Sequence, residues 1–373
     1  MSALTTDLDD VDGLLAADRE GLLRAAAMAG AGVRSVSQAQ SEGVLASLAD
    51  LRPRAVVIVT GSSATARRAA ELVNATIAPR LDAPLAVVPS LPGWIGPLDV
   101  VVLAGDDAGD RALTDGAMRA LRRRAEVVVV APLEGPLLDA VGNQPIVDLT
   151  PRLVVDPRFG FCRMVAALTA VCAGLTDVRL TPAPPDLAEL ADTLDDEAAA
   201  DHPSQESFHN QAKLLAMRVQ GRSAVWSGDT PGAVAVATHA SDVAFSVAGI
   251  LTPSAPEVTL TGRMREGFGA SGAAPTDDLF YDPDFDEPKT IGVRGILFTT
   301  AARRWSTERR VAAFGDIDVL AERPAEDGGP EIAEPYGDGD QGTDSPADLA
   351  AYLVLALRAE LAAVFIRLIG EAA

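Results

Sequence analysis

Short apolar runs alternate with amphipathic stretches along the first half of the chain. The apolar runs are rich in valine, each is flanked by a turn, and they cover residues 55–60, 98–104 and 126–131. Continuous apolar runs of this length are typical of strands that are buried on both faces of a parallel sheet. Helical periodicity fills the intervals, over 63–77, 111–124 and 136–141. Strands that alternate with helices predict a doubly wound parallel α/β sheet, with an opening helix over 7–28 and an apolar helix over 159–175.

The composition changes at residues 181–206, where proline, alanine and acidic residues dominate. Such a segment is typical of a solvent-exposed linker with one short helix. The alternation then restarts, with helices over 205–220, 232–248 and 302–313 and strands over 223–226 and 291–299. We therefore expect two doubly wound α/β domains, 1–180 and 207–373, joined by the linker 181–206. The acidic, glycine-rich stretch 321–345 is typical of a loop.

The pattern predicts a final helix over 346–370. Ser345 and Pro346 suit a helix cap and first turn, and one face of the helix is strongly apolar, with Leu349, Leu353, Leu357 and Leu361. Such a face needs a partner surface, which is either the rest of the second domain or a second subunit. We expect a homodimer.

Charge narrows the classes of partner. The chain has 373 residues, 48% hydrophobic content and a formal net charge of -22, so it can bury a large core and would repel nucleic acid and anionic lipid. Its longest basic cluster is only the three arginines 122–124. Neither nucleic acid nor a membrane is expected as a partner.

The two cysteines, Cys162 and Cys172, lie in an apolar helical run, as small buried hydrophobic residues do in a reducing compartment. Their spacing does not suggest a metal site. Residues 1–10 lack the basic and apolar regions of a signal peptide, and no apolar run is expected to reach membrane-spanning length. These observations predict a cytoplasmic protein with no cofactor.

An acidic turn follows the strand predicted at 98–104. A helix that begins just after a parallel strand presents unpaired N–H groups and a partial positive charge, and phosphate commonly binds there. Here Asp106, Asp107 and Asp110 occupy that turn. One of them can accept the N–H bonds as a helix cap, which leaves no positive field for phosphate. A divalent-metal or ammonium site built from the same carboxylates is the alternative.

A small polar turn, Gly61-Ser62-Ser63, lies between the first predicted strand and the following helix. Hydroxyl and N–H groups converge at such a position and can bind a ligand, although a plain helix cap explains a serine equally well. Gly61 alone makes neither a dinucleotide-binding fingerprint nor a phosphate-binding loop.

Several short segments, in this order, resemble the bifunctional phosphoglucose/phosphomannose isomerase family. They are Thr60-Gly-Ser-Ser63, Asp156-Pro-Arg-Phe-Gly160, Val225-Trp-Ser-Gly228 and Ser254-Ala-Pro-Glu-Val258. The resemblance implies two SIS-like domains, each a doubly wound parallel sheet, with a C-terminal helix. It also implies a sugar-binding turn at 61–63, an arginine that polarises the substrate at Arg158, and a ligand turn at Ser227 and Gly228.

The chain departs from this family at the groups that perform the chemistry. The family's base segment falls near residues 244–246, Ala-Phe-Ser, which cannot abstract a proton, and its histidine position falls near Ala255. Its phosphate turn falls at Ala104 to Asp110, where Asp106 and Asp107 are candidate ligand-binding residues, and its late lysine has no counterpart. Glu257 keeps a carboxylate in the right segment, and with His239 it could form a substitute acid/base pair, although His239 is expected to be a partly exposed helix residue. Glu257 and Arg158 are the candidate catalytic residues, and a salt bridge to Asp156 is the alternative role of Arg158.

These features predict a divergent member of the sugar-phosphate isomerase family that binds a sugar phosphate or related carbohydrate, with weak or lost catalysis. The alternative is a non-catalytic regulatory or scaffolding dimer that acts on a neighbouring carbohydrate enzyme.

Overall fold

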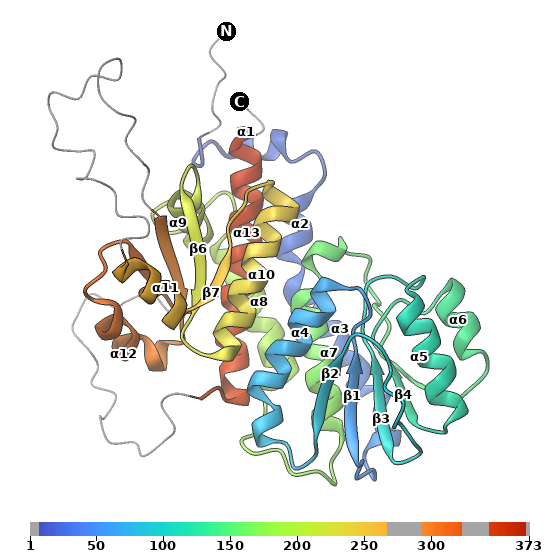
Figure 1. Cartoon of the computed structure of the whole chain (residues 1–373). Coiled ribbons are helices and arrows are strands. Elements are labelled where there is room, and N and C mark those ends of the chain that lie inside the picture. The colour runs from blue at the N-terminus through green and yellow to red at the C-terminus, as the bar shows by residue number, and fades with distance from the viewer. Residues whose placement is uncertain (1–6, 267–292, 323–342, 371–373) are drawn as a thin grey trace, which may run out of the picture.

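The computed structural model of the chain (Figure 1) describes residues 7–266, 293–322 and 343–370. Its first sheet contains five parallel strands in the order β2-β1-β3-β4-β5. Their bounds are β1 Ala55–Val59, β2 Leu85–Val88, β3 Asp99–Leu103, β4 Glu126–Val129 and β5 Val147–Asp148. The doubly wound parallel sheet expected from the sequence is confirmed, and β2 and β5 are added to the three strands expected.

Alternate side chains of the central strands enter two separate cores. Val56 and Ile58 of β1 pack with the helices α3 (Ala29–Ser41), α4 (Ala64–Thr76) and α7 (Phe161–Gly174). Val57 and Val59 pack on the other face with α5 (Arg111–Arg122) and α6 (Gly135–Val141). Both faces of β1 and β3 are therefore buried, which explains their unbroken apolar sequence.

The opening segment forms two helices, α1 (Val11–Ala17) and α2 (Leu22–Ala27), instead of the single expected helix. Gly21 has a φ of 70°, a left-handed conformation that glycine adopts without strain. The side chain of Asp18 accepts hydrogen bonds from the backbone N–H groups of Leu22 and Leu23. Asp18 and Gly21 thus end one helix and begin the next.

A second sheet of four parallel strands has the order β7-β6-β8-β9. The strands are β6 Ser223–Gly228, β7 Ser254–Pro256, β8 Val293–Phe298 and β9 Ile317–Leu320, and the helices of this unit are α9 Gln211–Val219, α10 Pro231–Ala248, α11 Glu257–Arg265 and α12 Ala301–Val311. Two of the strands, β7 and β9, are too short to be recognised in the sequence. Four short 3-10 turns complete the described chain, at Ala46–Leu48, Ala78–Arg80, Pro157–Phe159 and Pro346–Asp348.

The last helix, α13 (Leu349–Gly370), runs through the middle of the molecule between the two sheets (Figure 1). Ser345 and Asp348 form a reciprocal capping box before it. The helix packs against α8 (Leu187–Ala200), α9, α10 and α2 of the same chain, so its apolar face is covered without a second subunit. The reason given by the sequence for a homodimer is thereby removed, and the homodimer itself stays a prediction.

By length and composition, residues Pro346–Gly370 meet the criterion for a membrane-spanning helix. The expectation that no apolar run is long enough was therefore wrong. However, 89% of the most apolar window of this helix is buried inside the protein, as in the core helix of a globular fold.

The segment expected to be an exposed linker contains a helix of 14 residues, α8 (Leu187–Ala200). This helix packs against α3, and its residues Leu187, Leu190 and Leu194 are buried. The prediction that these side chains are exposed was therefore wrong. Leucines recur at every third or fourth residue of this acidic segment, and this spacing places them on one buried face of the helix. The division of the chain into domains at 181–206 stays a prediction. The loop expected over 321–345 lies mostly outside the described residues.

Candidate functional site

The first sheet brings its two polar turns together at the carboxyl ends of β1 and β3. Asp110 is the central residue. One oxygen of its carboxylate, Oδ2, accepts hydrogen bonds from the backbone N–H of Ser62 at 2.7 Å and from its hydroxyl at 2.6 Å. The other, Oδ1, accepts from the N–H groups of Ala112 at 2.7 Å and Leu113 at 3.3 Å, at the start of α5. Burial opposes ionisation of Asp110, but these bonds prevail and lower its pKa.

The second serine of the turn is bound in a similar way. The Ser63 hydroxyl donates to Asp106 Oδ2 at 2.9 Å and accepts from the backbone N–H of Ala66 at 3.1 Å, which caps α4. Gly61 has a φ of 56°, and a Cβ at this position would lie 2.4 Å from Asp110 Oδ2. Asp107 is exposed, and within the described residues its carboxylate accepts one hydrogen bond, from the N–H of Gly109 in its own turn. The self-capping interpretation of the acidic turn is therefore confirmed.

The carboxylates of this turn, Asp106, Asp107 and Asp110, do not form a metal site in the described structure. Among the residues that the structure describes, no group of three or more His, Cys, Asp or Glu side chains is placed to hold a metal ion. The metal alternative to self-capping thus finds no support in the part of the chain described.

Arg158 lies in the 3-10 turn before α7. Its guanidinium forms a two-point ion pair with Asp156, with Nε–Oδ1 at 3.0 Å and Nη2–Oδ2 at 2.6 Å. This pair lowers the pKa of Asp156. Weaker contacts reach Glu20 at 3.5 Å and the carbonyl of Ser246 at 3.4 Å, near the end of α10. Arg158 therefore pairs with acidic neighbours. Within the described residues it forms no hydrogen bond or ion pair with the turn 61–63.

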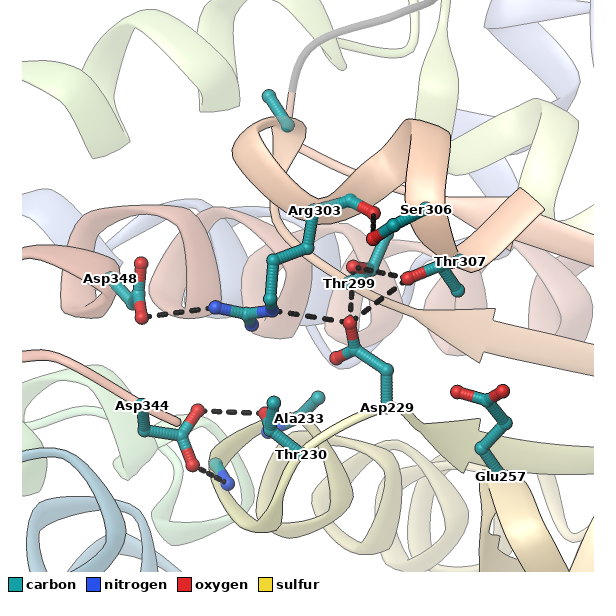
Figure 2. A network of polar contacts seen from close by, with 12 residues as sticks. Asp229, Thr230, Ala233, Glu257, Thr299, Arg303, Ser306, Thr307, Asp344 and Asp348 are labelled. Atoms are coloured by element: carbon teal, nitrogen blue, oxygen red, sulfur yellow. Dashed lines mark hydrogen bonds and ion pairs between the residues drawn. The ribbon is translucent and has the colours of Figure 1, made fainter. Parts of the chain in front are cut away.

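The second sheet has an equivalent junction between β6 and α10, shown in Figure 2. A Cβ at Gly228 would lie 2.3 Å from the backbone of Ala233, so only glycine allows the helix to approach the strand this closely. Thr230 caps the helix through the N–H of Ala233 at 3.3 Å. The neighbouring Asp344 accepts from Gly232 N–H at 2.7 Å and from the Thr230 hydroxyl at 2.7 Å. A protein carboxylate therefore occupies the N-terminus of this helix as well.

Asp229, beside this junction, is the centre of a buried polar network (Figure 2). Its Oδ2 accepts from the hydroxyls of Thr299 at 2.6 Å and Thr307 at 3.1 Å, and pairs with Arg303 Nε at 3.2 Å. Arg303 also contacts Asp348 at 3.2 Å and the Tyr352 hydroxyl at 2.7 Å. The network ties β6, α12 and the start of α13 into one unit.

Ser227 is fully buried, and its hydroxyl has no hydrogen-bond partner among the described residues. It does not line the cleft described next, whereas Gly228 does.

A cleft of about 930 Å³ opens at this edge of the second sheet. Residues Glu71, Asn74 and Ala75 of α4 form one wall, and residues of β6, the turn after it, α10, β7, α11 and α12 form the rest. Glu257 lies in the cleft, but both of its oxygens are bound by Arg310, at 2.9 and 2.8 Å. A second guanidinium, Arg265, also lines the cleft and lies over the ring of Phe314 at 5.5 Å.

His239 differs most from expectation. It was expected to be partly exposed, and it is fully buried, with Nε2 at 2.7 Å from Glu360 Oε1 and its ring stacked on Phe161 at 4.0 Å. Burial lowers its pKa well below the usual value, and nearby Arg68 adds to this effect. Burial raises the pKa of Glu360. The pair belongs to the packing between α10 and α13 and not to the cleft.

Sequence reasoning missed Asp229, Arg303 and Asp344. Asp229 follows the glycine of a predicted turn, and this position was the available signal. Asp344 is 112 residues from its partner Gly232, and no local pattern reveals such a pairing.

No protein-family model matches the chain, and no curated protein matches it in sequence. Solved structures share its fold. The tagatose-6-phosphate ketose/aldose isomerase from Escherichia coli matches 100% of this chain and 95% of its own, with a TM-score of 0.59 and 11% identity. The C-terminal domain of glucosamine-fructose-6-phosphate aminotransferase from Francisella tularensis matches 94% of this chain and 96% of its own, with a TM-score of 0.57 and 12% identity.

A glucose-6-phosphate isomerase like protein from Thermus thermophilus covers 97% of this chain and 93% of its own, with a TM-score of 0.51 and 16% identity. The chain thus has the two-unit α/β architecture of SIS-domain, phosphosugar isomerase-like proteins. Its two sheets, of five and four parallel strands, match the SIS-like fold expected from the sequence.

Proposed function

We propose that this protein binds a carbohydrate derivative in the cleft between α4 and the second sheet and that it has lost aldose–ketose isomerase activity. One observation carries the proposal. In both sheets, the helix N-terminus that could receive a phosphoryl group is occupied by a carboxylate of the protein itself, Asp110 in the first and Asp344 in the second. A phosphate dianion brought to either position would meet a negative charge in place of free N–H groups.

The lining of the cleft supports a carbohydrate ligand. Asn74 can donate hydrogen bonds to sugar hydroxyls and accept them. Glu71 can accept them, as can Thr238 and Thr261, whose own hydroxyl protons are donated to the carbonyls of Val234 and Glu257. Arg265 supplies a guanidinium with no carboxylate at ion-pair distance among the described residues. An anionic group on the ligand would be bound by this side chain, because an arginine fork matches carboxylate and phosphate geometry.

The loss of catalysis follows from the same contacts. Isomerisation through an enediol requires a base that moves a proton between neighbouring carbons. Glu257 is held at two points by Arg310, and neither Phe245 nor Ser246 can take its place. The three similar structures are an isomerase of tagatose 6-phosphate, a domain of glucosamine-fructose-6-phosphate aminotransferase and a glucose-6-phosphate isomerase like protein. Their names support a sugar phosphate as the first ligand to test.

Two measurements on the full chain test the proposal. A coupled assay should show no conversion of fructose 6-phosphate to glucose 6-phosphate or mannose 6-phosphate above background. Glucose 6-phosphate should raise the melting temperature by mass action, and Arg265→Gln should reduce this shift. The control Arg119→Gln changes a half-buried arginine outside the cleft, whose ion-pair partner within the described residues is Asp115, and it should leave the shift unchanged. Clear turnover, or an undiminished shift in Arg265→Gln, would overturn the proposal.

The alternative proposal, a regulatory or scaffolding dimer, shares the loss of catalysis. Light scattering of the full chain distinguishes the two, since a monomer at working concentrations contradicts the dimer and leaves ligand binding intact.

A further inference from the structure

A second cavity, of about 380 Å³, lies at the carboxyl edge of the first sheet, beyond β3, β4 and β5. It shares no residue with the cleft of the second sheet. Most of its lining is apolar and includes Met28, Leu133, Val155, Phe159 and Met164. A cavity of this character would bury the apolar body of a small molecule.

One cationic side chain enters this apolar lining. Arg163, in the first turn of α7, donates from Nη2 to the carbonyls of Val130 at 3.0 Å and Leu149 at 3.2 Å, and from Nη1 to Leu149 at 3.5 Å. No carboxylate lies within ion-pair distance of it in the described ranges. Burial alone lowers the pKa of Arg163 to about 10. The guanidinium thus carries a full charge that the protein does not neutralise.

The carbonyls do not by themselves account for an arginine. A neutral amide could donate to them, whereas a charge removed from water is stabilised chiefly by an opposite charge. The arginine has five N–H donors, and its bonds to the two carbonyls use only Nη1 and Nη2, so donors of this half-buried side chain remain for a ligand. A ligand anion would provide both the charge and the acceptor.

The other charged groups of the lining limit the ligand. Asp106, which binds Ser63, and Glu134 also line the cavity. Both would repel a dianion more strongly than a monoanion. The remaining polar groups are the hydroxyls of Thr65 and Thr150.

We propose that this cavity binds a small monocarboxylate with an apolar body, whose carboxylate pairs with Arg163. The site is independent of the carbohydrate cleft, because the two are built from different residues and different sheets.

Calorimetric titration of the full chain with benzoate and with its neutral isostere benzamide tests the site. Benzoate should bind saturably. Benzamide should bind with an affinity at least about ten-fold lower, as expected for loss of a charge-assisted pair. Arg163→Gln keeps donors for the two carbonyls and should abolish the preference for benzoate. Arg152→Gln, which removes an arginine paired with Glu42 and outside the lining, should preserve it.

A second pair of variants covers the case in which Arg163→Gln fails to fold. Val154 lines the cavity and is fully exposed, so its substitution leaves the core untouched. Val154→Glu should weaken benzoate binding and Val154→Lys should strengthen it, each by about two- to five-fold. Absence of benzoate binding, equal affinity for benzamide, or indifference to the charge at 154 would overturn the proposal. The thermal shift with glucose 6-phosphate should be unaffected in all these variants, which separates this site from the proposed function.

Discussion

At the scale of single residues, carboxylates define the chemistry of both sheet edges. Asp110 bridges the serine turn and the first turn of α5 with four hydrogen bonds, and Asp344 joins the start of α10 to the segment before α13. Each accepts from N–H groups that a helix leaves unpaired at its N-terminus. The helix dipole that could attract an anionic ligand is therefore used to stabilise the fold.

We predict that Asp110→Asn lowers the free energy of unfolding by about 1–3 kcal/mol, because it weakens a cap and a buried hydrogen-bonded group. Since the folded-state pKa of Asp110 lies below its usual 3.8, its contribution is complete above that pH and is lost as the pH falls through the folded-state value. Denaturant unfolding at pH 7 measures the loss. The exposed Asp107→Asn should change stability by less than about 0.5 kcal/mol, and equal stability of both variants would contradict the role of Asp110.

The buried pair of His239 and Glu360 gives a different prediction. In the folded state burial keeps Glu360 protonated and His239 neutral, so the pair holds one proton. Unfolded, the two groups titrate near their usual values of 4.5 and 6.5, and between these values the unfolded pair also holds one proton. The contribution of the pair to stability is then independent of pH in this window.

Glu360→Gln should make stability depend on pH in this window, because the folded protein no longer holds the proton of Glu360. In this variant the pKa of His239 is lower in the folded state than in the unfolded state. The free energy of unfolding therefore falls as the pH drops below 6.5, by up to about 1.4 kcal/mol per pH unit. Unfolding free energies measured across this window should show the gap between wild type and variant widening toward low pH. The exposed Glu206→Gln serves as control, and a constant gap for Glu360→Gln would contradict the assigned protonation states.

At the scale of elements, the sequence predicted most accurately those strands and helices that are buried on both faces. The valine runs of β1, β3 and β4 are recognisable because every side chain is buried or nearly so. Short strands such as β9, with the sequence Ile-Asp-Val-Leu and only half-buried side chains, carry no such signal. The break between α1 and α2 depends on Gly21 and a cap, which periodicity alone does not reveal.

Helix α13 is the element on which both units depend, and nearly all of its residues are buried. We predict that Leu357→Ala, at a fully buried position, lowers the free energy of unfolding by about 2–5 kcal/mol through lost burial and an added cavity. Leu251, which is 82% exposed, provides the matched control. Urea unfolding of the two alanine variants makes the comparison, and a loss below about 1 kcal/mol at 357 would contradict the core position of α13.

At the scale of the whole molecule, the cleft exists because the two units pack through α4 and α10. Glu71 and Asn74 of α4 face residues of the second sheet across it, and Arg68 pairs with Asp242 in the same interface. The sequence located both sheet edges, through Ser62, Asp106 and Gly228. It could not reveal which distant carboxylate fills each edge, since Asp110 and Ser62 are 48 residues apart and Asp344 and Gly232 are 112 apart.

The position of a bound phosphoryl group tests this interpretation most directly. A crystal of the full chain soaked in glucose 6-phosphate should show the phosphoryl group in the cleft beside Arg265, with Asp110 and Asp344 still bound to their helix N-termini. Phosphoryl density at hydrogen-bond distance from the N–H of Ser62 or Gly232, with either carboxylate displaced, would contradict it.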